Sequence, residues 1–548
     1  MTMRGEMMDM PLMISGILRH GARCHGEREI VTRLPESGQI HRYGYGDAWT
    51  RTGQLANALT KAMKIKPSDR VSTIAWNSHR HFELYYGISG IGAVVHTVNP
   101  RLAPDQIAWM LEHAQSKAVF FDVQFAPLVE AIAPHAKGVK HWVVLGGSEL
   151  TSKNKIKTVA YEDLIGAHKP DFDWPQFDEN AAAGLCYTSG TTGDPKGVLY
   201  SHRSTVLHAM ATCASDVIGV GAKGVALPVV PMFHVNAWGI PYATPMTGAK
   251  LVMPGAQLDG ASLHELIETE KVNYVAGVPT VWLGLLQYLR ENNKRIDSVE
   301  RVLIGGSALP EALLRAYEDN YGVRMQQGWG MTEMSPLGTV NTPLPKHEGL
   351  DREEEVKVKL KQGRLVYGVD MRIVDDEGKE LPWDGQSSGH VHVRGPWIAS
   401  GYFRGAGRES FTDDGWFKTG DVANLDSDGY MTITDRSKDV IKSGGEWISS
   451  IDLENAAMGH PDIAMAAAVG MPHTKWQERP LLVVQLLPGK EPNPESIIEY
   501  LEGKVAKWWI PNGIVFIDQM PIGATGKILK TKLREIYADY RFPDDPGV

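Results

Sequence analysis

Between about residues 45 and 320, segments with helical spacing alternate with short apolar runs, and this alternation constrains the fold more than any other feature. Segments such as "DAWTRTGQLANALTKAM" and "PDQIAWMLEHA" have the periodicity of helices. Runs such as "RVSTIAW", "KAVFFD" and "RVLIGG" have the length and composition of buried strands. Alternation of this kind is typical of parallel sheets covered by helices, so we predict an α/β fold.

The pattern changes at about residue 363. From there to residue 436, "RLVYGVDMRIVD", "SGHVHVRG" and "GYMTITDR" indicate antiparallel strands, joined by turns rich in glycine and aspartate. The remaining residues indicate a small α+β module. We therefore predict a large N-terminal domain, 1–437, with a β-rich subdomain at about 363–436, and a small, mobile C-terminal domain, 438–548.

Length and composition exclude several classes of protein. A chain of 548 residues is too long for a single core. The net charge is −9, and the acidic and basic residues are interspersed, which argues against a nucleic-acid partner. The three cysteines lack metal-ligand spacing and are odd in number, so a disulfide framework is not expected. No secretory pattern and no membrane-spanning run is present, which predicts a cytoplasmic protein without stable membrane insertion.

The stretch "CYTSGTTGDPKGVLYSH", from Cys186 to His202, has the composition of an anion-binding loop. Its glycines let backbone N–H groups approach a ligand closely, and its hydroxyls and lysine add further donors. A solvated hairpin loop is the alternative reading of the composition. The loop does not have the spacing of a Walker motif, and a Rossmann fingerprint is absent.

The loop resembles the signature of the acyl-adenylate-forming, or AMP-binding, superfamily. Other motifs of the superfamily follow it in the expected order: "PMFHVNAWG" (231–239), "GGSALP" (305–310), "QGWGMTE" (327–333), "GWFKTGD" (415–421), "DRSKDVIKSGGEWIS" (435–449) and "GATGKILK" (523–530). The resemblance covers essentially the full length. It is strongest to the fatty-acyl-CoA synthetase branch, near the medium-chain and 3-methylthiopropionate:CoA ligases.

The resemblance implies that a carboxylate attacks the α-phosphate of ATP and that pyrophosphate leaves. Oriented donors and positive charge are the main requirement for bringing two anions together. The loop would bind the leaving phosphates through Thr188, Ser189, Gly190, Thr191, Thr192, Gly193 and Lys196. Thr188 and Glu333 are the implied Mg²⁺ ligands, because Mg²⁺ prefers oxygen donors.

The nucleotide positions follow from the same resemblance. Asp421 would accept the ribose hydroxyls, and Arg436 would make a second contact to ribose or phosphate. The adenine would lie against Trp329, with Thr332 close to the α-phosphate. Its other neighbours would be Gly306, Ser307, Gln327 and Gly328. Tyrosine often occupies the position of Trp329 in the family, so the hydrogen bond made there is left open.

Lys527 is the implied catalytic lysine of adenylation, because the family places a lysine there between the acyl carboxylate and the α-phosphate. The preceding "PIGA" departs from the "PKT" that is common in the family. We expect the neighbouring Lys530 and Lys532 to be solvated charges.

A catalytic lysine on a separate module implies that the module moves. The resemblance places the pivot at Lys438 and makes Lys438 and Lys442 nucleotide contacts. Gly444 and Gly445 would line the route of the pantetheine arm. Trp447 is implied to lie near the nucleotide, with a packed core position as the alternative.

The expected acceptor is free coenzyme A, because no carrier domain follows Lys527. His234, Val235 and Trp238 are expected to line the acid pocket, with Trp238 as a tunnel gate or a plain pocket wall. We predict an ATP-, Mg²⁺- and CoA-dependent ligase for short or medium-chain acids, such as 3-methylthiopropionate, and a homodimer. A long-chain fatty-acyl-CoA ligase and a non-catalytic nucleotide- or CoA-binding homologue are the alternatives.

Overall fold

The computed structural model describes residues 3–150, 156–188, 195–436, 439–444, 446–523 and 527–545, with the backbone alone at 446 and 447. The chain forms two compact units. The first comprises Met1–Ala276, Met331–Leu337 and Pro396–Arg408, and the second comprises Gly277–Gly330, Gly338–Gly395 and Glu409–Val548. The predicted pivot at Lys438 lies outside the described residues, so the division into 1–437 and 438–548 stays a prediction.

The first unit contains a sheet with the strand order β7-β6-β5-β3-β4-β8-β9. All neighbouring strands are parallel except β8 and β9, which form an antiparallel hairpin. The strands are β3 (Arg70–Ile74), β4 (Val94–Thr97), β5 (Ser116–Asp122), β6 (His141–Leu145), β7 (Thr158–Ala160), β8 (Ala182–Tyr187) and β9 (Gly197–Ser201).

A second group of strands in this unit has the order β12-β10-β11-β1-β2. These strands are parallel except for β2, which is antiparallel to β1. They are β1 (Glu29–Arg33), β2 (Ile40–Gly44), β10 (Val225–Pro228), β11 (Lys250–Met253) and β12 (Tyr274–Gly277). Parallel strands are covered on both faces and therefore appear in the sequence as apolar runs, which is why the alternation predicted them.

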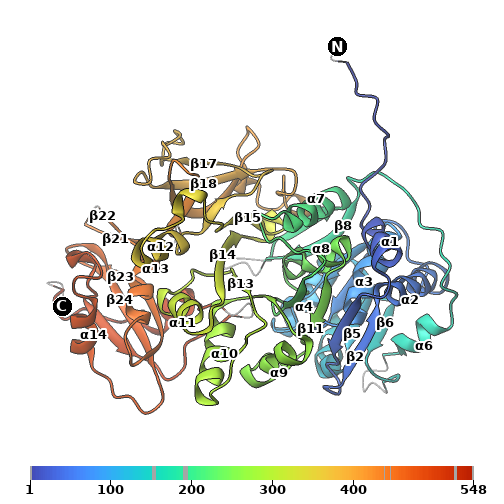
Figure 1. Ribbon diagram of the computed structural model, residues 1–548, viewed down its shortest axis with the longest axis horizontal. Coiled ribbons are helices and arrows are strands. Elements are labelled where there is room, and N and C mark those ends of the chain that lie inside the picture. Colours follow the sequence, from blue (N-terminus) through green and yellow to red (C-terminus); the bar gives the residue numbers. More distant parts are fainter. Residues whose placement is uncertain are drawn as a thin grey trace. The chain divides into compact units, whose positions relative to one another are not determined.

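The helices of the first unit cover these strands (Figure 1). They are α1 (Ile14–His25), α2 (Tyr45–Asn57), α3 (His79–Gly90), α4 (Pro104–Ala114), α5 (Ala126–Ile132), α6 (Tyr161–Gly166), α7 (His202–Cys213), α8 (Ile240–Thr247) and α9 (Gly260–Glu270). The expected helix "DAWTRTGQLANALTKAM" is α2 followed by one π-helical turn, Ala58–Ala62.

Helix α3 contacts strands of both groups, and every one of its residues is buried. Its charged side chain Glu83 and the imidazole of His81 are both paired. Glu83 accepts a 2.6 Å hydrogen bond from Tyr161 and forms a 2.7 Å ion pair with Arg51. His81 Nε2 lies 2.9 Å from the hydroxyl of Thr73, and burial lowers the pKa of His81 to about 4, so its imidazole is neutral. The helix can therefore lie inside the unit without unpaired charge.

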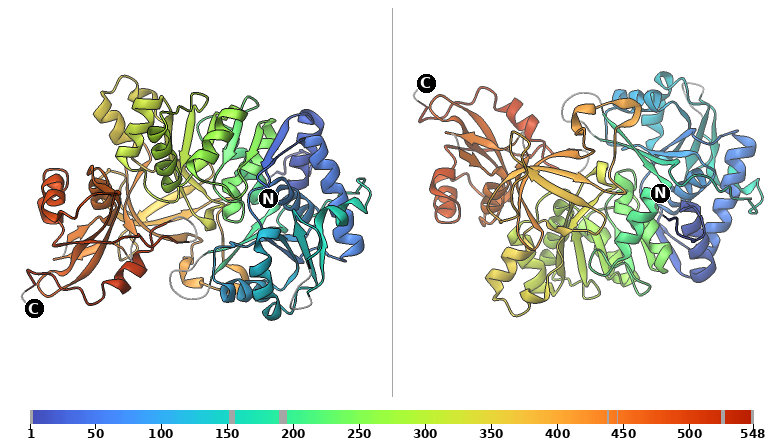
Figure 2. Two further views of the ribbon diagram at one scale, coloured as in Figure 1. Left: turned by 90° about the horizontal axis from the view of Figure 1, so that it is seen from below. Right: turned by 90° about the horizontal axis from the view of Figure 1, so that it is seen from above.

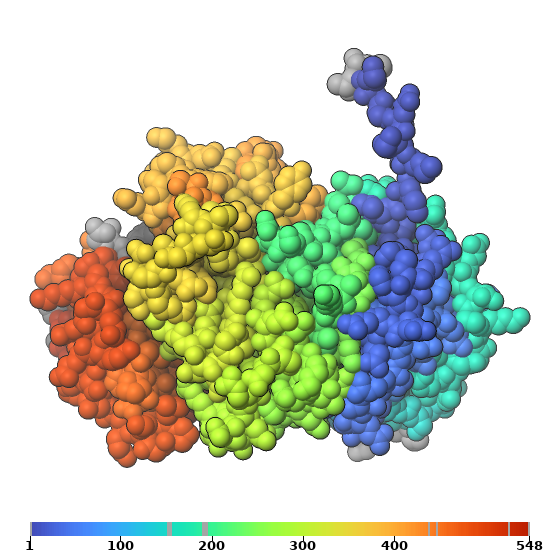
Figure 3. Space-filling view, in the orientation of Figure 1, coloured from blue at the N-terminus to red at the C-terminus, as the bar shows by residue number. Residues whose placement is uncertain are grey.

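The chain before α1 forms a narrow arm, which Figure 3 shows in blue, standing off the surface of the first unit. Met3, Met7 and Met8 on this arm are exposed. Its end is attached where the backbone N–H of Leu12 donates to Glu179.

The second unit continues with strands in the order β17-β18-β19-β20-β16-β15-β14-β13. β13 and β14 are parallel, and β15 is antiparallel to β16. The strands from β16 to β20 also pair antiparallel, as predicted for residues 363–436. The strands are β13 (Arg301–Ile304), β14 (Arg324–Gly330), β15 (Leu337–Val340), β16 (Gly363–Leu365), β17 (Asp370–Val374), β18 (Gly389–Arg394), β19 (Phe417–Leu425) and β20 (Tyr430–Arg436). The helices are α10 (Pro279–Glu291), α11 (Glu311–Tyr321) and α12 (Arg352–Lys359).

The last part of the second unit is a small α+β module, as predicted. Its sheet has the order β22-β21-β24-β23, and β25 also pairs with β24. Figure 2 shows helices on both sides of these strands, in orange and red. The elements are β21 (Ile441–Ser443), β22 (Glu446–Ile448), α13 (Ser450–Met458), β23 (Ile463–His473), β24 (Gln477–Leu486), α14 (Pro494–Leu501), β25 (Gly513–Phe516) and α15 (Lys530–Ile536).

The sheet of this module has a separate hydrophobic core on each face. Leu482 and Val484 pack with residues of β21, α13 and α14. Leu481 and Val483 pack with Met520 and with residues of α15. This arrangement follows from the period of two in β24, which sends successive side chains to opposite faces.

The α/β fold class predicted from the sequence is therefore confirmed. Among the described residues, no helix is both long enough and apolar enough to cross a membrane.

Candidate active site

The hairpin β8–β9 carries the two ends of the predicted phosphate-binding loop. The backbone N–H of Thr188 donates to the carbonyl of Lys196 over 2.9 Å, which closes the hairpin. The intervening predicted contacts lie outside the described residues: Ser189, Gly190, Thr191, Thr192 and Gly193. The structure thus fixes where this loop leaves and re-enters the sheet.

Lys196 and Glu333 are connected through Tyr402, a residue that the sequence analysis did not identify. Lys196 Nζ lies 5.2 Å from the centre of the Tyr402 ring. The hydroxyl of Tyr402 donates a 2.6 Å hydrogen bond to Oε1 of Glu333. A β-carbon at Gly407 would lie 2.9 Å from Lys196 Nζ, and Gly407 has a φ of +61°, so this position favours glycine. Lys196, the predicted phosphate contact, and Glu333, the predicted metal ligand, therefore both contact Tyr402.

The backbone around Glu333 is fixed by neighbouring elements. Thr332 and Glu333 are buried in a 3₁₀ turn, Thr332–Met334. The carbonyl of Thr332 accepts from the Tyr200 hydroxyl at 2.6 Å, and the carbonyl of Glu333 accepts from the N–H of Ala399 at 2.7 Å. These two hydrogen bonds fix the backbone from which the Glu333 side chain extends.

The donor set at Thr188 and Glu333 fits Mg²⁺, which prefers oxygen ligands and usually keeps water or phosphate in its shell. In the described part of the chain, no group of three or more His, Cys, Asp or Glu side chains could hold a metal ion.

The predicted acid pocket contains an unusual turn. Val235, Asn236, Ala237 and Trp238 have φ values of 47°, 52°, 48° and 55°, so four consecutive non-glycine residues are left-handed. His234 precedes the turn in an extended conformation. Val235 is buried, whereas Trp238 and His234 are partly exposed. A left-handed backbone conformation is rare at a β-branched residue such as Val235, and nothing in the sequence predicts this conformation.

Asn77 holds the chain that leads into this turn. Its side-chain N–H groups donate to the carbonyls of Pro228 and Val230, both at 2.9 Å. Its side-chain oxygen accepts from the N–H of Met232 at 2.6 Å. A single buried amide thus satisfies three backbone groups and fixes the approach to His234.

In the second unit, Trp329, Asp421 and Arg436 form a connected group. The indole N–H of Trp329 donates to Oδ2 of Asp421 over 3.0 Å, and Arg436 Nε lies 3.1 Å from Oδ1. Asp421 is 3% exposed and Trp329 is 9% exposed. The hydrogen bond that the sequence left open at position 329 is therefore made by the indole, and its acceptor is the predicted ribose carboxylate.

The other predicted adenine neighbours lie in the loop after β13 and within β14. Gly306 and Ser307 are exposed, and Gly306 has a φ of +87°. The side-chain oxygen of Gln327 accepts from the N–H of Leu309 over 3.2 Å, so Gln327 holds the loop that contains Gly306 and Ser307. A β-carbon at Gly328 would lie 3.5 Å from the carbonyl of Thr339.

Lys527 reaches this loop from the small α+β module. A β-carbon at Gly306 would lie 3.6 Å from Cε of Lys527. The segment that carries the lysine is closed by two backbone hydrogen bonds, from Gly523 to Lys527 (2.7 Å) and from Leu529 to Pro521 (2.8 Å). The predicted catalytic lysine and a predicted adenine neighbour are therefore adjacent in this structure.

The expectation that Lys530 is a solvated charge was wrong. Its ammonium forms a 2.7 Å ion pair with Glu454 and a 2.5 Å hydrogen bond with the hydroxyl of Ser450, and its side chain is 15% exposed. Burial raises the pKa of Glu454, and the ion pair opposes that shift. Lys532 is exposed, as expected.

Of the remaining predicted positions, Lys442 lies on β21 and Gly444 directly follows that strand. Lys442 is exposed, and its backbone N–H donates to Glu478 over 2.9 Å. Gly444 is exposed, with a φ of +62°. Lys438, Gly445 and the side chain of Trp447 lie outside what the structure describes.

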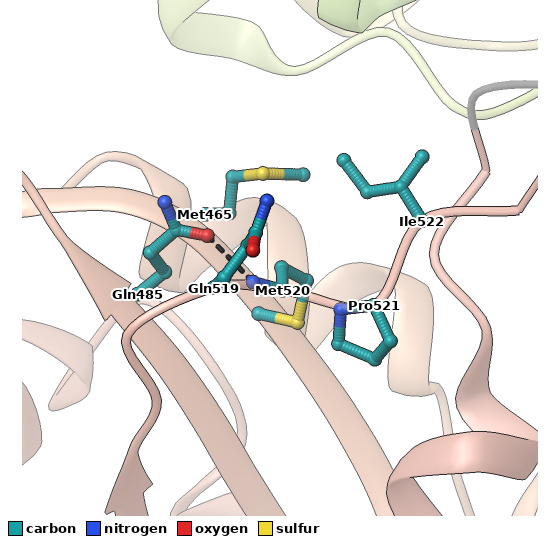
Figure 4. A pocket seen from close by; sticks show the side chains of 6 residues that line it. All are labelled: Met465, Gln485, Gln519, Met520, Pro521 and Ile522. Carbon is teal, nitrogen blue, oxygen red and sulfur yellow. Dashed lines mark hydrogen bonds between the residues drawn. The ribbon is translucent and has the colours of Figure 1, made fainter.

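A cavity of about 380 Å³ lies at the base of the segment that carries Lys527. Figure 4 shows its lining side chains, with the side-chain oxygen of Gln485 accepting from the backbone N–H of Met520 over 2.8 Å. The lining residues are Met465, Gln485, Gln519, Met520, Pro521 and Ile522. None of the predicted site residues lines it.

These groups are those of an enzyme that activates acids with a nucleotide: a lysine beside a candidate nucleotide loop, a buried carboxylate with two donors, and a phosphate-type hairpin. The chain belongs to the AMP-binding enzyme family. The model described as "AMP-binding enzyme" matches residues 18–403, and that described as "AMP-binding enzyme C-terminal domain" matches residues 452–527. The resemblance stated from the motifs is confirmed.

Three curated relatives cover nearly the whole chain. A 3-methylmercaptopropionyl-CoA ligase of Ruegeria lacuscaerulensis is 50% identical over 98% of this chain and 99% of its own. A medium-chain-fatty-acid–CoA ligase of Ectopseudomonas oleovorans is 49% identical over 98% of both chains. A long-chain-fatty-acid–CoA ligase of Thermus thermophilus is 46% identical over 97% of both chains.

Proposed function

We propose that the protein is an ATP-dependent, AMP-forming acid:CoA ligase for short or medium-chain carboxylic acids. The observation that carries the proposal is the position of Lys527, whose Cε would lie 3.6 Å from a β-carbon at Gly306. Asp421, Trp329 and Arg436 belong to the same unit as this lysine. A cation is thus available beside a candidate nucleotide site.

In the first half-reaction, a carboxylate oxygen attacks the α-phosphorus of ATP, an acyl–phosphate bond forms, and pyrophosphate leaves. The ammonium of Lys527 would lie against the two reacting anions and reduce their repulsion. Asp421 would accept hydrogen bonds from the ribose, with its orientation fixed by Trp329 and Arg436. Lys196 would stabilise the leaving pyrophosphate as a point charge.

Thr188 and Glu333 would hold Mg²⁺, which neutralises phosphate charge when bound. Tyr402 donates to Glu333 and thereby orients its carboxylate. Because Lys196 lies over the ring of Tyr402, one tyrosine supports both the phosphate cation and the metal carboxylate.

In the second half-reaction, the thiol of coenzyme A attacks the acyl carbonyl, a thioester forms, and AMP leaves. Gly444 and Gly445 would leave room for the pantetheine arm, and the chain would pivot at Lys438. The two cores of the small module support separate roles for Lys527 and for the turn after β21. The segment that carries Lys527 packs into the core on one face of the sheet, whereas Ile441 of β21 packs into the core on the other face.

Two of the relatives support a short or medium acid, and the relative named as a long-chain ligase is almost as similar, so sequence identity alone does not fix the acyl length. Trp238 is the residue that favours a closed pocket, because its indole stands on the turn expected to line it. A thioether sulfur resembles a methylene in size and polarity, so such a pocket would accept 3-methylthiopropionate much as it accepts pentanoate.

The decisive experiment incubates the protein with ATP, Mg²⁺, CoA and linear acids from C2 to C16, together with 3-methylthiopropionate. Pyrophosphate release and thioester mass are both recorded. We expect kcat/KM to rise by up to about fourfold per methylene, because each buried methylene contributes about 0.8 kcal/mol of binding free energy. Beyond the end of the pocket kcat/KM should fall. A rise that continues to C16 would establish the long-chain alternative, and no product with any acid would establish the non-catalytic one.

A homodimer, a cytoplasmic location and the boundary at residue 438 also remain proposals. Light scattering after size exclusion, cell fractionation and limited proteolysis would test them in turn.

A further inference from the structure

The sheet of the small module is interrupted along one edge of β24. β23 pairs with β24 along its whole length, so β21 and β25 must share the other edge. β21 pairs at Ser443 with Gln477, and β25 begins to pair at Gly513 with Leu481. Arg479 lies on β24 between these two points.

The guanidinium of Arg479 occupies this interruption. Nη1 donates to the hydroxyl of Ser443 at 3.0 Å and to the carbonyl of Trp508 at 2.9 Å. Nη2 donates to the carbonyl of Ile510 at 3.1 Å, and Nε donates to the side-chain oxygen of Asn512. The residue is only 9% exposed. One planar cation therefore joins β21 to the segment that leads into β25.

Ser443 is followed by a tightly held glycine turn. Gly444 has a φ of +62°, and its N–H donates to the carbonyl of Trp476 at 2.8 Å. A β-carbon at Gly444 would lie 2.8 Å from the Trp476 ring, so the turn packs directly against that side chain. The Ser443 hydroxyl is thus held by Arg479 on β24, and the Gly444 N–H is held by Trp476, the residue before β24.

We propose that Arg479 is a positioning residue for thioester formation, which it supports by fixing the Ser443–Gly444 turn. The inference rests on the proposed function, in which this turn borders the path of the CoA thiol. Arg479 makes no hydrogen bond, among those of the described residues, to the segment that carries Lys527. Loss of the arginine should therefore damage the second half-reaction and spare the first.

Lysine cannot replace this arginine, because a single ammonium cannot point at four acceptors that lie in different directions. Arg479→Lys would keep the charge and release the turn. Ser443→Ala would remove the hydroxyl while the arginine keeps its two backbone carbonyls. Arg541→Lys is the matched control, since Arg541 is an exposed arginine of the same module that bonds to the carbonyls of Ala538 and Tyr540.

The test measures the two half-reactions separately. Adenylation is followed as pyrophosphate release without CoA, and transfer is followed as thioester formed from supplied acyl-adenylate and CoA. We expect Arg479→Lys to slow transfer roughly 10- to 100-fold, as displacement of a positioned group does, while adenylation stays within about threefold. Ser443→Ala should reproduce part of this loss, and Arg541→Lys should change neither rate.

Equal losses in both half-reactions would assign Arg479 a purely structural role and overturn the inference, as would unchanged transfer in Arg479→Lys. If Arg479→Lys does not fold, Ser443→Ala decides the matter by the same ratio of rates. Failure of the unmodified protein to form adenylate or thioester would instead refute the proposed function, so the two failures are distinguishable.

Discussion

Replacing Trp329 with phenylalanine tests the proposed nucleotide site most directly. The indole N–H donates to Oδ2 of Asp421 over 3.0 Å, while Arg436 contacts the other carboxylate oxygen at 3.1 Å. Phenylalanine keeps an aromatic face against which adenine could stack, but it has no donor. The substitution therefore removes the orientation of the carboxylate and leaves its charge in place.

The magnitude follows from the nature of the bond. A hydrogen bond to an ionised group contributes about 1.5–3 kcal/mol, and each 1.4 kcal/mol is a factor of ten in affinity. Because Arg436 still holds one carboxylate oxygen, we expect the loss of binding free energy to lie near the lower value. That loss corresponds to about a tenfold rise in the KM for ATP. The KM for the acid should stay within about twofold, since the hydrogen bond from Trp329 to Asp421 and the ion pair of Asp421 with Arg436 lie within the second unit, whereas the proposed acid pocket is in the first.

The assay combines steady-state kinetics with calorimetric titration of ATP, and thermal unfolding verifies that the variant is folded. Trp329→Tyr is the matched variant, because its phenol offers a donor at a position where the family often has tyrosine; it should lose less affinity than Trp329→Phe. An unchanged ATP affinity in Trp329→Phe, or an equal rise in both KM values, would refute the reasoning.

Three further predictions concern other parts of the chain. Lys527→Ala should slow pyrophosphate release at least about 1000-fold and leave thioester formation from supplied acyl-adenylate within about threefold, because its charge acts where carboxylate meets phosphate; equal damage to both would contradict this. Tyr402→Phe should raise the Mg²⁺ concentration needed for half-maximal activity about tenfold, since Glu333 loses a charge-assisted hydrogen bond; an unchanged Mg²⁺ titration would count against the metal assignment. Burial raises the pKa of Asp122 to about 7, and its carboxylate accepts from the N–H of Trp76. The folded state thus holds this proton more tightly, so the free energy of unfolding should fall as the pH rises from about 4 to 7. Asp122→Asn should remove that fall and be more stable at pH 8 by roughly 4 kcal/mol at most, measured by urea unfolding; an unaltered pH profile would refute the assignment.

The sequence was sufficient wherever a feature depended on near neighbours in the chain. The buried strands β5 and β13 were predictable because parallel strands covered on both faces are continuous apolar runs. A loop between β8 and β9 was predictable because its glycines and hydroxyls lie within one short stretch, and its role in binding phosphate stays a prediction.

Features built from distant residues were not predictable. Lys530 is paired and largely withdrawn from solvent because Glu454, 76 positions earlier in the chain, comes to lie beside it, and nothing near Lys530 in the sequence indicates that partner. Tyr402 was missed for the same reason, since Lys196 and Glu333 come from two other segments. The left-handed turn at Val235–Trp238 contains residues that normally avoid this conformation, so composition argues against it.

That turn has a consequence for engineering the protein. A left-handed conformation costs about 1–2 kcal/mol per non-glycine residue, so four such residues store roughly 4–8 kcal/mol. The whole net stability of a folded domain is only about 5–15 kcal/mol. A stability-guided redesign would therefore choose these positions first and replace them with glycine, although they are the positions proposed to form a wall of the acid pocket. Heat resistance and acyl selectivity would then compete for the same four residues, and a library that improves one should be screened for the other.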